Sequence, residues 1–126
     1  MYQDVEREKP IAFFDSGAGG LTVLALAARL LPAENFLYFG DTANAPYGSK
    51  SKEEVRALSM QAAKLLVEKG SKALVVACNT ATSAAVDLLR QEFSLPVIGM
   101  EPAIKPALAE GGKVLVMATP LTLREE

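Results

Sequence analysis

The sequence predicts an α/β fold in which a parallel sheet is covered by helices on both faces. Short apolar runs alternate along the chain with longer segments of helical periodicity. Each run is almost continuously apolar, as expected for strands buried on both sides, and a polar or glycine-rich loop follows most of them. Because right-handed crossovers bring such loops to one edge of the sheet, we expect a ligand to bind at that edge.

Strands are predicted at the apolar runs, which are residues 11–14, 36–39, 73–77, 97–98 and 113–117. Helices are predicted between them, at residues 21–31, 55–69, 79–93 and 104–109. Pro32 ends the first helix, and Gly70 closes the second, which begins after a capping-box pattern at residues 51–54. Asn79 and Thr80 are expected to cap the third helix.

The composition excludes several classes of function. The chain has 126 residues, of which 50% are hydrophobic, and this is enough to form a core. The net charge is -2 and basic residues form no run, so nucleic acid is not the expected partner. The charged residues among the first ten positions leave no apolar stretch for a secretory signal, and no segment approaches membrane-spanning length. These features predict a soluble cytoplasmic protein that does not bind membranes.

Few residues are available for chemistry. The single cysteine excludes an internal disulfide, and the absence of histidine excludes Ser-His-Asp triads, Cys-His dyads and the usual zinc sites. The glycine-rich segment at residues 16–20 is neither a dinucleotide-binding fingerprint nor a P-loop, because no lysine closes it. We therefore expect no metal and no organic cofactor, and chemistry carried by the cysteine, carboxylates, hydroxyls, amides and backbone.

Three polar segments should meet at the carboxyl edge of the sheet, because each directly follows a predicted strand. They are residues 15–20, 41–48 and 78–82. The first segment has two interpretations of about equal weight. It is either an active-site loop or a tight turn in which Asp15 only caps the following helix.

Cys78 is the candidate catalytic group, although free cysteine is often just a small buried apolar residue. Its position favours function. At the junction from strand to helix, unpaired backbone N–H groups and the positive end of the helix favour the thiolate, which is the form that removes protons. Asn79, Thr80 and Thr82 add amide and hydroxyl groups suited to holding a carboxylate, with helix capping as the alternative role.

Taken together, the three segments resemble the glutamate racemase family. The matching strings are FDSGAGGLTV at residues 14–23, YFGDT at 38–42, PYG at 46–48 and VVACNTA at 75–81. The resemblance runs in order from about residue 11 to residue 119. Several linked motifs at matching spacing are far more specific than any one of them.

The resemblance implies a flavodoxin-like lobe, one of two in an isomerase that interconverts L- and D-glutamate without a cofactor and supplies D-glutamate for peptidoglycan synthesis. Two cysteines then face opposite sides of the α-carbon, so that one thiolate removes the α-proton and the other thiol returns a proton. By this resemblance Cys78 is one of the pair, and Asp15 assists proton transfer at its thiol. The positions that match substrate-holding residues are Ser16, Tyr47, Gly48, Asn79, Thr80 and Thr119.

The chain departs from the family in one respect. The second cysteine, which lies far downstream in a Cys-Thr-His motif in the family, does not occur in residues 1–126. The chain is therefore expected to hold half of the machinery and to be inactive alone, unless a homodimer places two copies of Cys78 on opposite faces of the substrate. The resemblance divides the chain into a charged arm at 1–10, a first lobe at 11–99 and the start of a second lobe at 100–126.

Two alternatives of different kinds stay open. The first is a sister activity, aspartate or hydantoin racemase, although aspartate enzymes tend to have histidine where this chain has Thr82. The second is a truncated ligand-binding module without turnover, which the lone cysteine supports. A flavodoxin-like phosphate binder is weakened by the missing lysine in the glycine-rich loop.

Overall fold

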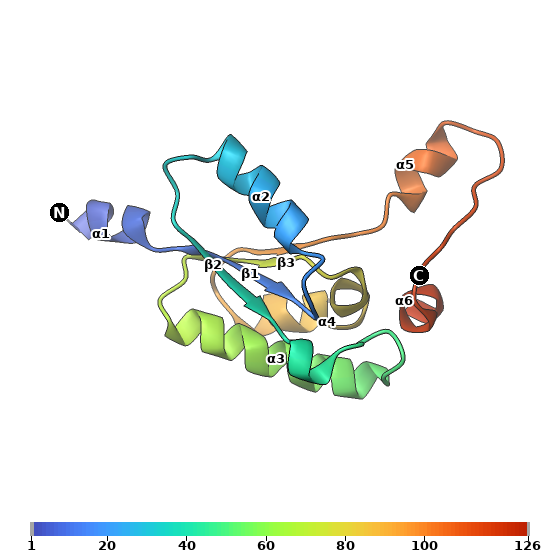
Figure 1. Ribbon diagram of the computed structural model, residues 1–126, viewed down its shortest axis with the longest axis horizontal. Helices are drawn as coiled ribbons and strands as arrows, with labels where there is room; N and C mark the ends of the chain where they lie inside the picture. Colours follow the sequence, from blue (N-terminus) through green and yellow to red (C-terminus); the bar gives the residue numbers. More distant parts are fainter. Residues whose placement is uncertain (1, 126) are drawn as a thin grey trace.

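The computed structural model describes residues 2–125, and in this part of the chain four parallel strands form one sheet (Figure 1). The strands are β1 (Ile11–Asp15), β2 (Phe36–Gly40), β3 (Ala73–Val76) and β4 (Val97–Gly99). Their order is β2-β1-β3-β4, so the first strand of the chain lies inside the sheet. The parallel sheet confirms the α/β fold class expected from the continuous apolar runs.

Helices cover both faces of this sheet, as predicted. They are α1 (Tyr2–Glu8), α2 (Leu21–Leu30), the short 3-10 helix η1 (Thr42–Asn44), α3 (Lys52–Glu68), α4 (Asn79–Glu92), α5 (Ile104–Ala109) and α6 (Pro120–Glu125). Figure 1 shows α2 on one face, with α3 and α4 together on the other. The connection from β1 to β2 runs toward one edge of the sheet, and the connection from β2 to β3 runs back past β1 toward the other edge. Because both crossovers are right-handed, their helices lie on opposite faces.

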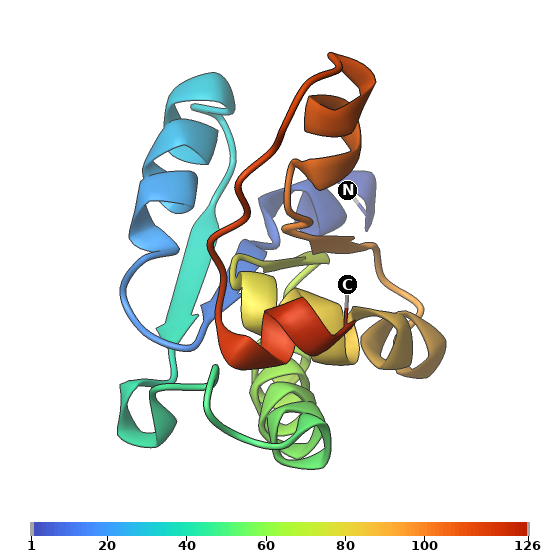
Figure 2. The same ribbon diagram turned by 90° about the vertical axis from the view of Figure 1, so that its right-hand side faces the viewer.

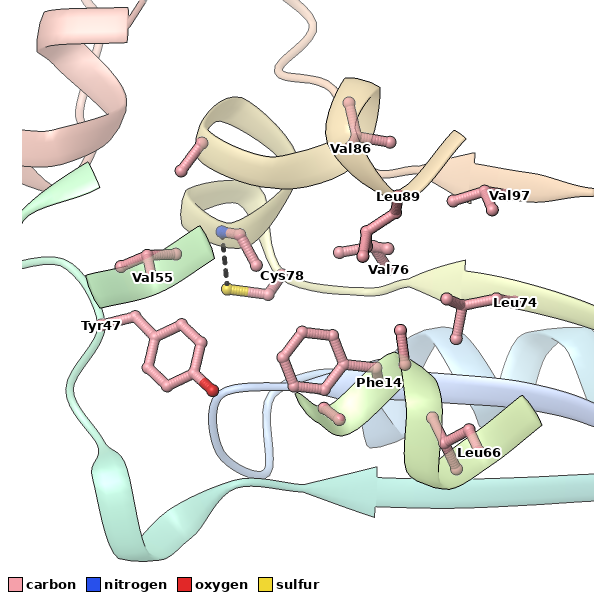
Figure 3. Packing of buried hydrophobic residues seen from close by; sticks show 14 of the residues in the cluster. Phe14, Tyr47, Val55, Leu66, Leu74, Val76, Cys78, Val86, Leu89 and Val97 are labelled. Atoms are coloured by element: carbon pink, nitrogen blue, oxygen red, sulfur yellow. Dashed lines mark hydrogen bonds between the residues drawn. The ribbon is translucent and has the colours of Figure 1, made fainter. Parts of the chain in front are cut away.

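The core lies between the sheet and the α3–α4 layer. Alternate residues of a strand point to the same face, and on β1 and β3 this face carries Ala12, Phe14, Leu74 and Val76, all fully buried (Figure 3). The two helices fill the other side with small and branched residues, including Ala63, Leu66, Ala81, Ala84 and Leu89. The α2 layer is much thinner, because α2 has no buried residue and its Leu26 and Leu30 are exposed.

Helix α3 begins and ends where the sequence indicates. The Ser51 hydroxyl accepts a hydrogen bond from the Glu54 N–H at 3.1 Å, and the Glu54 carboxylate accepts one from the Ser51 N–H at 2.8 Å. This is the predicted capping box. At the other end Gly70 has φ +86°, a conformation that favours glycine.

The prediction of a strand at residues 113–117 is wrong. This segment is extended but pairs with no strand in the described part of the chain, and Leu115 and Met117 are 86% and 88% exposed. A strand needs the N–H and C=O groups of a neighbouring edge as well as apolar side chains, and the chain leaves the sheet after β4 instead of returning to it. The segment leads to α6, which packs against α4 (Figure 2).

The N-terminal segment expected as a charged arm contains α1, whose C-terminal end is bonded to residues beside the sheet. The Asn35 amide donates to the Glu8 carbonyl at 2.8 Å, and Lys72 donates to the Arg7 carbonyl at 2.7 Å. Lys72 also pairs with Glu34. Between residues 2 and 125 no helix combines the length and apolar character needed to cross a bilayer.

Candidate active site

The three polar segments predicted to meet at the carboxyl edge do lie together. Asp15 is paired in register with Gly40, and the Asp41 N–H donates to the Asp15 carbonyl at 2.9 Å. On the other side of β1, the Ala77 N–H donates to the Phe14 carbonyl at 2.8 Å. The sheet thus sets residues 15–20, 41–48 and 78–80 side by side.

Cys78 itself is the N-cap of α4. Its sulfur accepts a hydrogen bond from the Ala81 N–H at 3.3 Å, drawn as the dashed line in Figure 3. The expectation that Asn79 and Thr80 cap this helix is therefore wrong; they are its first two residues. A sulfur acceptor fills the place that a hydroxyl or carboxylate oxygen usually takes, so the thiol faces the first free N–H groups of the helix.

The Cys78 thiol is 7% exposed and has a second polar neighbour. Its Sγ atom donates toward the Ser16 Oγ at 3.5 Å. Ser16 lies in the loop after β1, so this contact joins the first and third polar segments. The thiol is thus held between a hydroxyl and a helix N-terminus.

Asp15 shapes the glycine-rich loop around its own carboxylate. One oxygen accepts the Ser16 N–H at 2.8 Å, and the other accepts the Gly20 N–H at 2.8 Å. A Cβ added to Gly20 would lie 3.0 Å from the Ala77 Cβ, so the loop must stay close to β3. The structure does not show Asp15 capping α2: the N-cap is Gly20, and no side chain caps this helix. The Asp15 carboxylate instead bonds the loop that leads into α2.

Tyr38 is a neighbour of this loop that the sequence analysis missed. Its hydroxyl donates to the Gly17 carbonyl at 2.8 Å and lies 3.3 Å from an Asp15 oxygen. Burial, followed by the nearby Asp15 carboxylate, raises the pKa of Tyr38 to about 12. The phenol therefore remains a hydrogen-bond donor to the loop over the whole range in which enzymes usually work.

Tyr47 is only 1% exposed and is held by a buried carboxylate. Its hydroxyl donates to Asp41 at 2.6 Å, and the Asn44 amide donates to both Asp41 oxygens at 2.9 and 3.1 Å. Burial first, and then the hydrogen bond to Asp41, raise the pKa of Tyr47. Because the phenol is engaged inside the protein, the groups that Tyr47 and Gly48 can offer a ligand are those of the backbone.

Gly48 lies directly against Thr119, which is distant in sequence. A Cβ added to Gly48 would lie 2.5 Å from the Thr119 Cβ, closer than any real side chain allows. The Leu121 N–H also donates to the Gly48 carbonyl at 3.3 Å. Glycine at position 48 therefore permits the start of α6 to reach the loop after β2.

Three threonine hydroxyls meet at this point. The Thr80 and Thr119 oxygens are 2.8 Å apart, those of Thr119 and Thr122 are 3.0 Å apart, and the Thr122 hydroxyl lies 3.3 Å from that of Thr80. Thr80 and Thr119 are predicted site residues, whereas Thr122 is not. No pattern in the sequence marks Thr122, since it is one polar residue in a short helix.

The predicted site residues thus form two groups. Asp15, Ser16 and Cys78 make one chain of contacts, and Gly48, Thr80 and Thr119 make the other. Asn79, exposed at the start of α4, lies between Cys78 and Thr80 in the sequence. Within residues 2–125 no cluster of three or more Cys, Asp or Glu side chains is arranged to hold a metal ion.

A cavity of about 480 Å³ lies elsewhere, between α4 and the segment that leads to α5. Its lining residues are Thr82, Ser83, Val86, Asp87, Glu101, Pro102, Ile104, Lys105 and Glu125. Of these, only Thr82 is among the residues expected from the sequence to hold a carboxylate. Thr82 is buried and bonds the Val76 carbonyl and the Met100 N–H, so it holds β3, β4 and α4 together and does not take part in either group.

Known proteins are similar to this chain in sequence and fold. A family model described as Asp/Glu/Hydantoin racemase matches residues 21–126. Glutamate racemase from Clostridium botulinum (strain Hall) is 59% identical over 121 residues, which cover 94% of this chain and 47% of the relative. The corresponding protein of strain Alaska E43 is 55% identical over 124 residues. The chain therefore spans about half the length of the curated relatives it matches.

Solved structures extend the similarity to the fold. Glutamate racemase from Thermus thermophilus, in complex with beta-chloro-D-alanine, has a TM-score of 0.82 and 47% identity, covering 94% of this chain and 46% of that one. The enzyme from Francisella tularensis, in complex with D-glutamate, has a TM-score of 0.80 and 36% identity over the same shares.

Proposed function

This chain belongs to the Asp/Glu/hydantoin racemase family, and we propose that it carries one half of the active site of a glutamate racemase. The observation that carries the proposal is the placement of Cys78. Its sulfur caps α4, accepts the Ala81 N–H and lies 3.5 Å from the Ser16 hydroxyl. This is the environment in which a thiol acts as a base toward a carbon-bound proton.

The proposed reaction is the interconversion of L- and D-glutamate without a cofactor. The Cys78 thiolate takes the α-proton and becomes a thiol, while the electron pair left on the α-carbon is delocalised into the substrate carboxylate. A second thiol on the opposite face then donates its proton to that carbon and becomes a thiolate. Inversion needs both groups, because a proton returned to the face from which it came restores the starting enantiomer.

The contacts suggest which of the other residues assist proton transfer and which bind the substrate. Asp15 shapes the loop that presents Ser16, and we propose that its carboxylate assists proton transfer at Cys78. The charged groups of glutamate then lie against the groups that remain. These are the Ser16 and Thr80 hydroxyls, the Thr119 hydroxyl, the Asn79 amide and the backbone of Tyr47 and Gly48.

Cys78 is the one cysteine of residues 1–126, so a single copy of them does not supply the second thiol. We propose that residues 11–99 form the first lobe and that residues 100–126 begin a second lobe, which supplies the other thiol from further along a longer chain. The packing of α6 against α4 supports the proposal, because the Thr119 hydroxyl then lies 2.8 Å from that of Thr80. The proposal includes a cytoplasmic role in supplying D-glutamate for peptidoglycan, as the family resemblance implies.

The choice of glutamate over aspartate rests on the relatives and not on Thr82. That side chain is engaged between β3 and Met100, so the difference from aspartate enzymes at this position has no direct contact with the candidate site. A comparison of binding by the two amino acids distinguishes the alternatives. The non-catalytic module, the other alternative, predicts binding without any exchange of the α-proton.

One experiment tests both the binding and the chemistry. L-glutamate is incubated with the chain in D₂O, the α-proton signal is followed by NMR, and the product is analysed for chirality. We expect slow α-proton exchange that requires Cys78, with no accumulation of D-glutamate, because Cys78 reaches one face only. The loss of enclosure from water in a single lobe makes the exchange slow.

The control is the Cys78→Ala variant, which should show no exchange. Equal exchange in this variant and the parent chain would contradict the assignment of Cys78. Accumulation of D-glutamate that depends on Cys78 would contradict the half-site argument unless two copies combine. In that case activity per chain falls on dilution, and activity proportional to concentration at high dilution excludes the dimer.

A further inference from the structure

We propose that Thr122 is a positioning residue that orients the hydroxyl groups of Thr80 and Thr119 toward the substrate; this inference rests on the proposed function. The three hydroxyl oxygens form a triangle with sides of 2.8, 3.0 and 3.3 Å. Thr122 is 1% exposed, and its hydroxyl oxygen lies within hydrogen-bonding distance of both other threonine hydroxyls. It is the most deeply buried corner of the triangle.

The number of hydroxyl protons determines whether the three threonines can bind a carboxylate. Each hydroxyl has one proton to donate and two lone pairs that accept. A closed ring uses all three protons internally, which leaves none for an incoming carboxylate. A carboxylate can therefore be bound only when one hydroxyl turns its proton outward and the other two donate in sequence toward it.

The burial of the three residues determines the order in which their hydroxyls donate to one another. Thr122 and Thr80 are buried, whereas Thr119 is exposed at the start of α6. The Thr122 hydroxyl donates to Thr80, which then donates to Thr119, and the Thr119 proton is free to point outward. Such a chain of hydroxyls polarises each member, so the last donor binds an anion more strongly than an isolated hydroxyl does.

Two further contacts hold Thr119 in the required orientation. The Thr122 N–H lies 3.4 Å from the Thr119 oxygen and occupies one of its lone pairs. On the other side a Cβ at Gly48 would lie 2.6 Å from the Thr119 methyl group, so the methyl packs against Gly48 and the oxygen faces the triangle. Thr122 supplies the contacts on the oxygen side, and without its hydroxyl Thr80 loses the group that donates to it.

The test compares two substitutions in the complete 126-residue chain. Thr122→Val keeps the shape and removes the hydroxyl, whereas Thr122→Ser keeps the hydroxyl. The side-chain rotamers of Thr80 and Thr119 are measured from three-bond couplings to their methyl carbons, and glutamate affinity is measured by NMR titration. Ser59→Ala is the matched control, because Ser59 is fully buried on α3 and its hydroxyl has no hydrogen-bond partner among residues 2–125.

We expect single rotamers at Thr80 and Thr119 in the parent chain, averaged rotamers in Thr122→Val, and single rotamers again in Thr122→Ser and Ser59→Ala. Glutamate affinity should fall about five-fold in Thr122→Val only, which corresponds to the roughly 1 kcal/mol that one hydrogen bond contributes. Unchanged rotamers in Thr122→Val would overturn the proposal. If this variant does not fold, averaged rotamers in the parent chain would overturn it equally.

The result also separates this inference from the proposed function. If the parent chain binds neither glutamate enantiomer, the proposed function fails, and the rotamer comparison still decides whether Thr122 positions the two hydroxyls. If glutamate binds but Thr122→Val binds it as tightly as the parent chain, the positioning role is wrong and the proposed function stands.

Discussion

Cys78 and Ser16, which are 62 residues apart in the chain, approach within 3.5 Å between the thiol sulfur and the serine oxygen. The Ser16 N–H is itself held by the Asp15 carboxylate at 2.8 Å. Thiol, hydroxyl and carboxylate therefore follow one another across two adjacent strand ends. A substitution of any of these three residues should therefore change the hydrogen bonding at the position of the sulfur.

Cys78 should react with iodoacetamide faster in the folded chain than in an unfolded control at the same pH. The Ala81 N–H and the start of α4 place hydrogen-bond donors at the sulfur, and Ser16→Ala should slow the reaction by removing a hydroxyl that can donate to it. Labelling is followed by mass spectrometry over a range of about pH 6 to 9 around the usual thiol ionisation. Slower labelling of the folded chain than of the control would mean that the site is closed or the thiol is not activated.

Replacing Tyr47 by Phe should lower the free energy of unfolding by about 1–3 kcal/mol, because it leaves the buried Asp41 carboxylate without its 2.6 Å partner. Urea denaturation measures the change. Asn44→Ala is the comparison, since it removes the other donors to Asp41 from an exposed side chain and should cost less. Equal stability of Tyr47→Phe and the parent chain would show that the Asp41 contact contributes nothing.

Ser51→Ala should cost about 1 kcal/mol of stability through loss of the N-cap of α3. Ser49→Ala, two residues earlier in the exposed loop, is the control and should be neutral. Bonding to the Ser51 N–H, followed by the Ser51 hydroxyl, lowers the pKa of Glu54. This stabilisation is present above the ordinary glutamate pKa and is lost as pH falls, so the difference between Ser51→Ala and the parent chain should shrink in acid.

Gly48→Ala should detach the start of α6, because the new Cβ would meet Thr119 at 2.5 Å. Gly48 does not have a positive φ, so the effect is steric. A loss of about 1–3 kcal/mol is expected from overpacking, together with faster amide exchange in α6 and weaker glutamate binding. Gly17→Ala is the stability control, since a Cβ there meets nothing within 4 Å. Unchanged α6 protection in Gly48→Ala would refute this contact.

The stability of the chain should decline in alkali through Tyr38. Its folded pKa is raised to about 12, above the ordinary value of 10.0. The contribution is therefore complete below the unfolded pKa and is lost as pH rises through the interval between the two values. Tyr38→Phe should flatten this decline. Tyrosinate absorbance, compared between Tyr38→Phe and the parent chain, gives the titration directly, and a midpoint for Tyr38 near 10.0 would contradict the raised value.

The apolar runs predict the sheet well because four of them pair with one another in it. The run at 113–117 has the same composition and β-propensity, yet it is exposed and unpaired. Hydrophobicity identifies segments that can pair, but the edge they pair with is a property of the whole chain. For the same reason the division into lobes remains a prediction.

The three segments of the site were predictable from the ends of the strands, whereas the supporting residues were not. Tyr38 reaches Asp15 because Asp15 pairs with Gly40, which makes Tyr38 its diagonal neighbour on the same face of the sheet. That relationship needs the register of two strands. Thr122 needs the return of α6 to α4, which no local pattern contains. The cap at Cys78 was missed because sulfur is a rare helix cap.

The position of β1 inside the sheet has a consequence for how the chain acquires its structure. Both neighbours of β1 come later in the sequence, and its second edge is completed only when residues 73–76 are available. β1 leaves the ribosome before both of its partners and must therefore wait, with its apolar side chains unpaired, until the second crossover has been synthesised. Pairing across such separations makes folding slow compared with helical proteins, and it makes this early segment the natural target of a chaperone during translation.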